Sequence, residues 1–132
     1  MKDLMYLGKE VKNSWGTVAT TDRFIKEQPK LMARFMLATL KALRLVKHNR
    51  EAAVDAIVKF SEVKRELAER KYDEVIRTFA SNGVVDEKTQ KTDLDIVRLV
   101  PNVNKEVPIE RAYNFSFAAQ ADKELTRAGW RP

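Results

Sequence analysis

Cysteine is absent from the sequence, histidine occurs once, and glycine occurs four times among 132 residues. The absence of cysteine excludes disulfide bonds and thiolate chemistry, so the redox compartment cannot be predicted. A lone histidine without cysteine cannot form a zinc site of the usual kind. Four glycines leave no glycine-rich phosphate loop, and neither a Glu-x-x-His nor a G-x-S-x-G motif occurs. We therefore expect no metal, no cofactor and no enzymatic activity.

Long apolar runs are also absent. No stretch of about 18 consecutive apolar residues occurs, so we expect no membrane-spanning helix. The first residues, MKDLMYLGKEV, lack the apolar core that precedes a secretory cleavage site, and we expect no signal peptide in this chain. Lys and Arg number 25 against 19 Asp and Glu. The excess of +6 permits a nucleic-acid or anionic-lipid partner but does not by itself favour one.

The sequence does have enough apolar residues for one modest core. Of its residues 44% are hydrophobic and 33% are charged, which is typical of a globular domain. Its periodic segments predict a single, mainly α domain of about six helices with one short strand. Within this domain we expect a hinge-like segment over residues 1–20 and a helical region over residues 21–132.

The predicted strand covers Gly16–Thr20, where valine and threonine favour extended backbone. Thr21 is a candidate N-cap for a short helix through Gln28, and Pro29 fits the first position of a new helix. From Pro29 to His48, apolar residues cover more than half of the helix circumference. We expect this helix to be buried on most sides and to form the centre of the core.

Later segments continue the helical pattern, with capping residues at their starts and glycine after their ends. The tail over residues 130–132 is expected to be loose. The expected elements are a helix capped by Asn49 with Ala53, Ile57 and Phe60 inward, a helix from Ser61 or Glu62 to Ser81 stopped by Asn82-Gly83, a helix from Asp86 to about Val100, a turn at Pro108–Asn114, and a last helix capped by Ser116 and stopped by Gly129.

Polar clusters on these helices allow a structural and a functional interpretation. His48 falls at the end of a helix, where an imidazolium complements the dipole, and this role is favoured over catalysis. The carboxylates of Glu66, Glu69, Asp73 and Glu74 resemble a salt-bridged solvent face more than an acid–base pair.

One face of the long helix carries cations without an acid among them. Such a face could bind phosphates or a membrane surface, but a solvated helix face is the favoured interpretation. No aromatic residues alternate with the cations, so base stacking is not indicated and a nucleic-acid partner is disfavoured. The face consists of Lys30, Arg34, Lys41, Arg44 and Lys47.

The segment Ser14, Trp15, Gly16 and Thr17 is the candidate ligand-binding site. The indole ring can form an apolar wall, and the hydroxyl groups can donate hydrogen bonds to a polar or anionic ligand. The structural alternative is that the tryptophan closes the edge of the core. The residues alone leave these two interpretations equal.

The order of several residues resembles the C-terminal part of the substrate-binding proteins of ABC importers. The similar class is the one for nitrate, sulfonate, taurine and thiamine-pyrimidine precursors. Gln28-Pro29-Lys30 stands where that family has Asn-Pro-Glu, and Asn49-Arg50-Glu51 stands where it has a second such motif. The residues that carry the resemblance are Phe24, Pro29, Leu31, Phe35, Ala38, Ala42, Asn49 and Ala52-Ala53, followed by Val107-Pro108 and Phe115-Ser116-Phe117.

The resemblance implies the C-terminal portion of a type II periplasmic-binding-protein α/β fold. It implies that a small sulfonate, nitrate or pyrimidine-like ligand is captured without covalent chemistry, and that an ABC permease and its ATPase are partners of the parent protein. It also implies a periplasmic or extracytoplasmic location for that parent. Ser14 to Thr17 would then lie near the ligand cleft, where the crossover between lobes meets it.

The long helix of such a protein would pack on a sheet that this chain does not supply. Large uncovered apolar patches favour association, so we expect a homo-oligomer, with a two-fold dimer as the simplest form. The expected interface residues are Leu31, Phe35, Met36, Leu40 and Leu43. Two alternatives stay open beside the solute-binding component, which are a self-associating helical interaction domain without a ligand and a basic nucleic-acid-binding helical protein.

Overall fold

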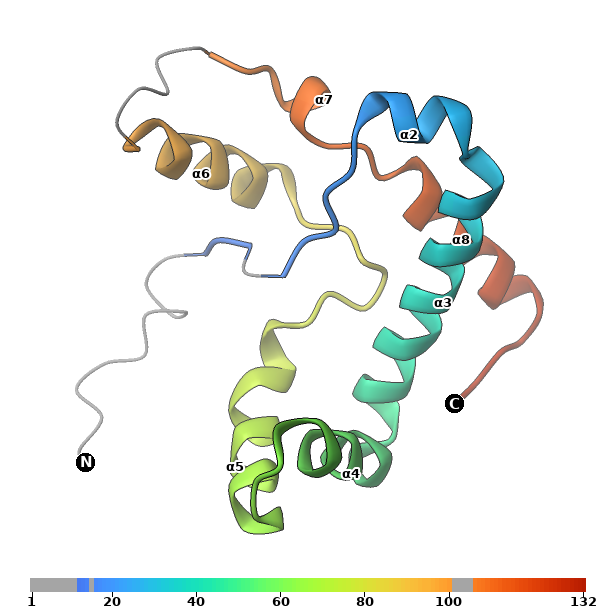
Figure 1. Cartoon of the computed structure of the whole chain (residues 1–132), viewed down its shortest axis with the longest axis vertical. Helices are drawn as coiled ribbons and strands as arrows, with labels where there is room; N and C mark the ends of the chain where they lie inside the picture. Colours follow the sequence, from blue (N-terminus) through green and yellow to red (C-terminus); the bar gives the residue numbers. More distant parts are fainter. Residues whose placement is uncertain (1–11, 15, 101–105) are drawn as a thin grey trace. The chain divides into compact units, whose positions relative to one another are not determined.

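A computed structural model describes residues 12–14, 16–100 and 106–132 of the chain (Figure 1). The chain divides into two compact units. The first unit contains Met1–Thr21 and Val85–Asn114, and the second contains Asp22–Val84 and Phe115–Pro132. The prediction of a single domain over residues 1–132 stays a prediction.

The described residues are mainly helical, as the sequence predicts. The second unit contains α2 (Asp22–Glu27), α3 (Pro29–His48), α4 (Arg50–Ser61), α5 (Arg65–Val75), the 3₁₀ turn η1 (Ile76–Thr78) and α8 (Ser116–Arg127). The first unit contains α6 (Glu87–Arg98) and α7 (Ile109–Ala112).

The predicted strand at Gly16–Thr20 is wrong. Residues 16–20 have no regular secondary structure, and all five are exposed. A strand needs a neighbour for its backbone hydrogen bonds, and the described part of the chain contains no other strand that could pair with it. The β-propensity of valine and threonine therefore has no ladder to stabilise here.

The long helix and its successor begin and end where their capping residues predict. Pro29 occupies the first turn of α3, where its missing N–H is not needed. The side chain of Asn49 accepts a hydrogen bond of 3.0 Å from the backbone N–H of Ala52, so it caps α4. The backbone N–H of Asn49 also donates to the carbonyl of Leu45 at the end of α3. One residue therefore joins the two helices.

Replacing Asn49 with alanine is expected to lower the free energy of unfolding by about 1 kcal/mol, because the N–H of Ala52 loses its acceptor. Urea denaturation followed by circular dichroism measures this change. Asn49→Asp, whose carboxylate can accept the same bond, should keep most of the stability. An alanine variant as stable as the parent would mean that the cap contributes nothing.

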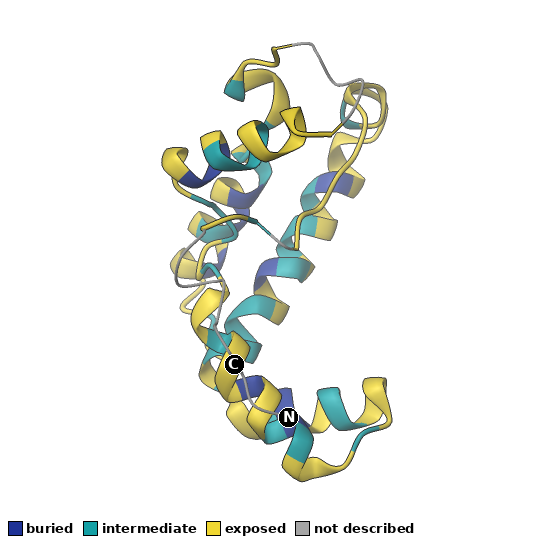
Figure 2. Ribbon diagram, turned by 90° about the vertical axis from the view of Figure 1, so that its left-hand side faces the viewer, coloured by how far each residue is buried: buried dark blue, intermediate teal, exposed yellow. Residues whose placement is uncertain are grey.

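Two hydrophobic clusters hold the second unit together, and buried residues form narrow patches on its helices (Figure 2). The first cluster joins α3 to α8, and the second joins α4 to α5. The buried members of the first are Leu40, Ala118, Ala121 and Leu125, and those of the second are Ala53, Val54, Ala68 and Tyr72. The sequence predicts that Phe60 faces inward with Ala53, but Phe60 is 91% exposed, so that prediction is wrong.

The later boundaries follow the predicted caps with two corrections. Asp86 caps α6, since its carboxylate accepts from the N–H of Thr89 at 3.0 Å. The predicted helix from Ser61 or Glu62 to Ser81 is too long at both ends, because Ser61 still belongs to α4 and α5 covers only Arg65–Val75 before the chain tightens into η1. Ser116 does not cap α8 but is its first residue, following Phe115 in the cap position.

Gly83 lies where the chain needs a residue without a side chain. Its φ is +69°, which is left-handed backbone, and a Cβ built there would lie 3.1 Å from Cδ1 of Leu40. The turn after η1 can therefore approach the first cluster closely.

Candidate functional site

The structure places only part of the predicted ligand segment, and the ligand-binding role of Ser14 to Thr17 stays a prediction. Ser14 is half-buried, Gly16 and Thr17 are exposed, and Trp15 lies outside the described residues. The backbone N–H of Ser14 donates to Oδ1 of Asp93 at 2.8 Å. The hydroxyl oxygen of Ser14 is buried and has no hydrogen-bond partner among the described residues.

Asp93 on α6 connects Ser14 to the residue that follows α7. The phenol of Tyr113 donates to Oδ2 of Asp93 at 2.9 Å, so both carboxylate oxygens accept a bond. Burial, followed by the hydrogen bond to Asp93 and its charge, raises the pKa of Tyr113 to about 12. Asp93 thus joins the segment at Ser14 to Tyr113, and this cluster links α6 to two other segments of the first unit.

The raised pKa of Tyr113 predicts a loss of stability in alkali. The pKa of Tyr113 in the folded state is above the ordinary value of 10.0. The neutral phenol therefore contributes fully to the free energy of unfolding below pH 10, and this contribution is lost as the pH rises to about 12. Tyr113→Phe should remove this part of the pH dependence. Ultraviolet absorbance of tyrosinate and circular dichroism, recorded through the same pH range, test the prediction, and a titration of Tyr113 near its ordinary pKa would contradict it.

An apolar stripe runs along the side of α3 that faces away from α8. We call Leu31, Phe35, Ala38 and Ala42 the α3 stripe, because their spacing of four, three and four residues places them on one face. All four are exposed, and Leu31 and Phe35 retain 50% and 49% of their accessible surface. The expectation that this helix is buried on most sides is therefore wrong, since only Met32 and Leu40 of its residues are buried.

The predicted interface residues fall on two different sides of α3. Leu31 and Phe35 belong to the α3 stripe, whereas Leu40 has no exposed surface. Met36 and Leu43 are half-buried and pack against the cluster that contains Leu40. In this fold Leu40 contacts its own chain, so it has no surface for a second copy, and the interface prediction can apply only to the other side of the helix.

The cations of α3 are also divided between two environments. Lys30, Arg34 and Lys41 are exposed, as predicted for a solvated face. Arg44 is not, because its guanidinium pairs with Asp122 at 2.9 Å and donates to Oγ1 of Thr126 at 3.0 Å. Its side chain is only 17% exposed. Arg44 is covered because α8, which is distant in the sequence, places Asp122 beside it.

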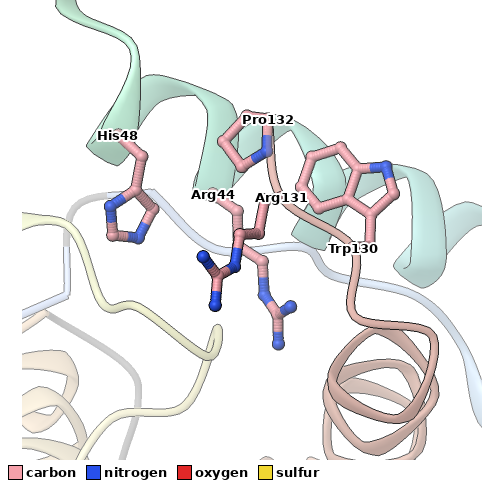
Figure 3. A pocket seen from close by; sticks show the side chains of 5 residues that line it. All are labelled: Arg44, His48, Trp130, Arg131 and Pro132. Carbon is pink, nitrogen blue, oxygen red and sulfur yellow. The ribbon is translucent and has the colours of Figure 1, made fainter.

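A hollow of about 440 Å³ lies beside the end of α3 (Figure 3). His48 and Trp130 lie at its two ends, with the guanidinium groups of Arg44 and Arg131 between them. Pro132 completes the lining. The tail is not loose at Trp130, since this ring packs against the first cluster and its backbone N–H donates to Leu125. Three basic side chains and one indole ring around a hollow suit a small anion.

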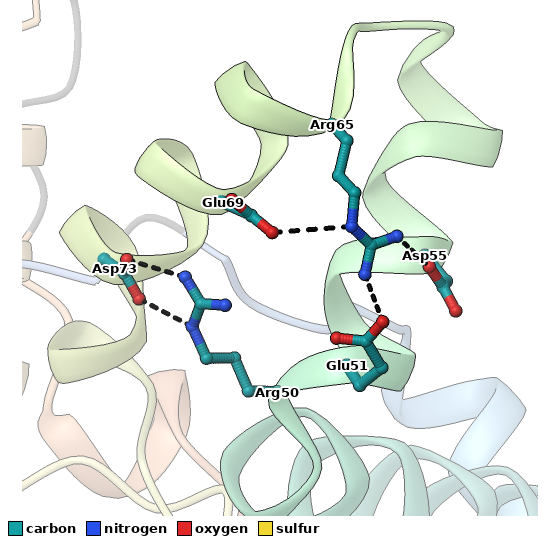
Figure 4. A network of polar contacts seen from close by, with 6 residues as sticks. All are labelled: Arg50, Glu51, Asp55, Arg65, Glu69 and Asp73. Carbon is teal, nitrogen blue, oxygen red and sulfur yellow. Dashed lines mark hydrogen bonds and ion pairs between the residues drawn. The ribbon is translucent and has the colours of Figure 1, made fainter.

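The carboxylates of α4 and α5 form ion pairs with two arginines (Figure 4). Arg65 pairs with Glu51 and Asp55 of α4 and with Glu69 of α5. Arg50 forms two hydrogen bonds with Asp73, of 3.1 and 2.9 Å, and these lower the pKa of that carboxyl. The predicted salt-bridged face is confirmed for Glu69 and Asp73. Among the described residues, no three or more histidine, aspartate or glutamate side chains are grouped so that they could hold a metal ion.

Within the described ranges, no helix has the length and apolar character needed to span a membrane. Comparison of the chain with family models, with curated proteins and with solved structures finds no match.

Proposed function

We propose that this chain is a helical interaction domain that binds an amphipathic helix of another protein through the α3 stripe. The single observation that carries the proposal is the exposed apolar face of α3, whose opposite face already packs on α8. Helix-binding surfaces present apolar anchors at these spacings. Leu31 and Phe35 are the large anchors of the stripe, and each is half exposed.

The proposal accounts for an apolar surface that the core does not use. Scattered exposed apolar residues are ordinary, but four in register along one helix form a continuous face. Ala38 and Ala42 leave room beside Leu31 and Phe35, so a second helix could approach the backbone of α3 closely.

A peptide-binding experiment tests this proposal. The probe is a fluorescent amphipathic peptide of about 18 residues, or five helical turns, with leucine on one face and glutamine on the other. Fluorescence polarisation should show binding, and the double variant L31A/F35A should weaken it at least tenfold. The matched control is L99A/F60A, which removes the same two residue types from positions that are 82% and 91% exposed.

The control should bind like the parent chain. Absence of binding to any amphipathic peptide, or an equal loss in both double variants, would overturn the proposal. Light scattering on the peptide-free chain detects the alternative occupant, a second copy. If the chain forms a dimer and L31A/F35A dissociates it, the α3 stripe binds a second copy and not an external helix. That result would support the predicted homo-oligomer.

A second candidate function is capture of a small anion, as the resemblance to importer substrate-binding proteins implies. The observation in its favour is the hollow lined by Arg44, His48, Trp130 and Arg131. Sulfonates and nitrate carry the negative charge that the guanidinium of Arg131 recognises, since Arg44 already pairs with Asp122, and the indole suits a flat ligand.

Thermal-shift measurements with taurine, nitrate and an aminopyrimidine test this candidate. A bound ligand should raise the melting temperature of the chain, and Arg131→Ala should abolish the rise. Arg23→Ala is the matched control, because Arg23 is an exposed arginine on α2 that pairs only with Glu27 of its own helix among the described residues. An unchanged melting temperature with every ligand would exclude this candidate for the chain as it stands.

A further inference from the structure

We infer that the helix bound on the α3 stripe is acidic along one edge, and that its carboxylates pair with Lys30, Arg34 and Lys41. The inference rests on the proposed function and names the chemistry of the partner. Its basis is the distribution of charge on α3, a helix of 20 residues that contains no aspartate or glutamate.

The three cations form one edge of the stripe. At about 100° per residue, Lys30, Arg34 and Lys41 lie between about 70° and 110° round the helix from the centre of the stripe, all on the same side. Each is exposed, and none forms an ion pair with another described residue. Arg44, which faces α8, does have an acidic partner. Where α3 meets a helix of its own chain, an acid thus accompanies a cation.

The opposite edge of the stripe carries no charge. Thr39 lies there, at about 70° from the centre. Val46 lies on the same side at about 50°, but it packs against the second cluster. A partner helix would therefore meet cations on one side and neutral residues on the other. This asymmetry favours a helix with carboxylates on a single edge, and it determines the orientation of the partner helix on α3.

A second copy of α3 fits this surface less well. An antiparallel two-fold pair places the two cationic edges on the same side of the interface, so that Arg34 of each copy approaches Lys41 of the other. Like charges placed together in this way oppose association. An acidic helix meets the same edge with attraction.

A lipid surface also fits this face less well than a helix does. Insertion into a membrane interface depends on large apolar side chains. The centre of the stripe carries Ala38 and Ala42, which offer little area to lipid. The same two alanines allow a helix axis to approach to the short end of the usual separation of about 8–10 Å.

Three peptides of one design test the inference. They share the leucine face and carry glutamate, glutamine or lysine along one edge. We expect the glutamate peptide to bind about tenfold more tightly than the glutamine peptide, and the lysine peptide to bind most weakly. Raising the salt from about 0.05 M to about 0.5 M should remove most of this difference.

Matched charge variants locate the effect on α3. K30Q/R34Q/K41Q should remove the preference for the glutamate peptide and leave binding of the glutamine peptide unchanged. The control K59Q/K64Q/K71Q removes the same net charge from exposed positions on or beside α4 and α5, and it should keep the preference. Circular dichroism of both triple variants checks that they are folded.

The outcomes separate the inference from the proposal beneath it. Equal affinity for the glutamate and glutamine peptides, both lost in L31A/F35A, would overturn the acidic edge and leave the helix-binding function standing. An equal effect of the two triple variants would show general attraction and would likewise overturn the acidic edge. Failure of all three peptides to bind would overturn both. If the chain binds no peptide but cosediments with vesicles of phosphatidylglycerol, the α3 stripe binds a membrane surface and not a helix.

Discussion

Leu40→Ala is expected to lower the free energy of unfolding by about 3 kcal/mol, one of the largest effects of a single substitution in this chain. Leu40 has no exposed surface and packs against Ala118, Ala121 and Leu125 of α8. Alanine would remove most of the side chain that joins the two helices and leave a cavity that small neighbours cannot fill. Urea denaturation, followed by circular dichroism and by the fluorescence of Trp130, measures the loss.

Leu31→Ala is the matched control for this prediction. The same side chain is removed from the same helix, but Leu31 is 50% exposed. Surface substitutions of this kind change stability by only about 0.5 kcal/mol. A loss for Leu31→Ala as large as that for Leu40→Ala would mean that the α3 stripe is covered within the chain, and it would overturn the proposed helix-binding surface.

The extent of α3 could be predicted because its boundaries depend on neighbours in the sequence. Pro29 cannot continue a helix from Gln28 but can begin one, and Asn49 caps the next helix with a bond to Ala52 only three residues away. Such determinants are local, so residue order is enough to find them.

The end of α5 and the missing strand could not be predicted in this way. A helical apolar pattern continues through Ile76 and Phe79, yet α5 ends at Val75 because its last turn tightens into η1. The backbone at Gly16–Thr20 has strand-forming residues, but a strand is stable only beside another strand. The missing strand depends on a partner from elsewhere in the chain, and the end of α5 depends on a change of helix type, neither of which apolar periodicity encodes.

The same limit explains why the candidate sites were only partly found. Leu31, Phe35 and Leu40 are all apolar residues on one helix, and their sequence pattern does not say which side α8 covers. Arg44 belongs to an acid-free helix, and its partner Asp122 is 78 residues further along the chain. The hollow was missed because Trp130 and Arg131 follow the last helix and reach the end of α3 only through tertiary folding.

Tyr72→Ala is expected to lower the free energy of unfolding by about 3–4 kcal/mol. The effect is comparable to that of Leu40→Ala but arises in the other cluster. The side chain is 5% exposed and packs with Ala53, Val54 and Ala68 between α4 and α5. Removing an aromatic ring from such a site costs the buried area and leaves a cavity. Denaturation by urea measures the change, with α5 as the first helix expected to lose its packing.

The hydroxyl group of Tyr72 adds a separate contribution. It donates a bond of 2.8 Å to the carbonyl of Val46, which lies in the last turn of α3, where helix carbonyls lack partners within the helix. Tyr72→Phe keeps the ring and its packing beneath Arg50, so it should cost only about 1 kcal/mol. A cost as large as that of alanine would mean that the bond to Val46, and not the ring, holds the end of α3 against α5.

The two clusters allow a last test of how the second unit is built. Leu40 and Tyr72 belong to separate clusters that share no buried residue, so their losses should add within about 0.5 kcal/mol in the double variant if unfolding is cooperative. A total well below the sum would show that α4 and α5 unfold before α3 separates from α8. In that case Tyr72→Ala alone would leave the α3 stripe folded and able to bind the amphipathic peptide.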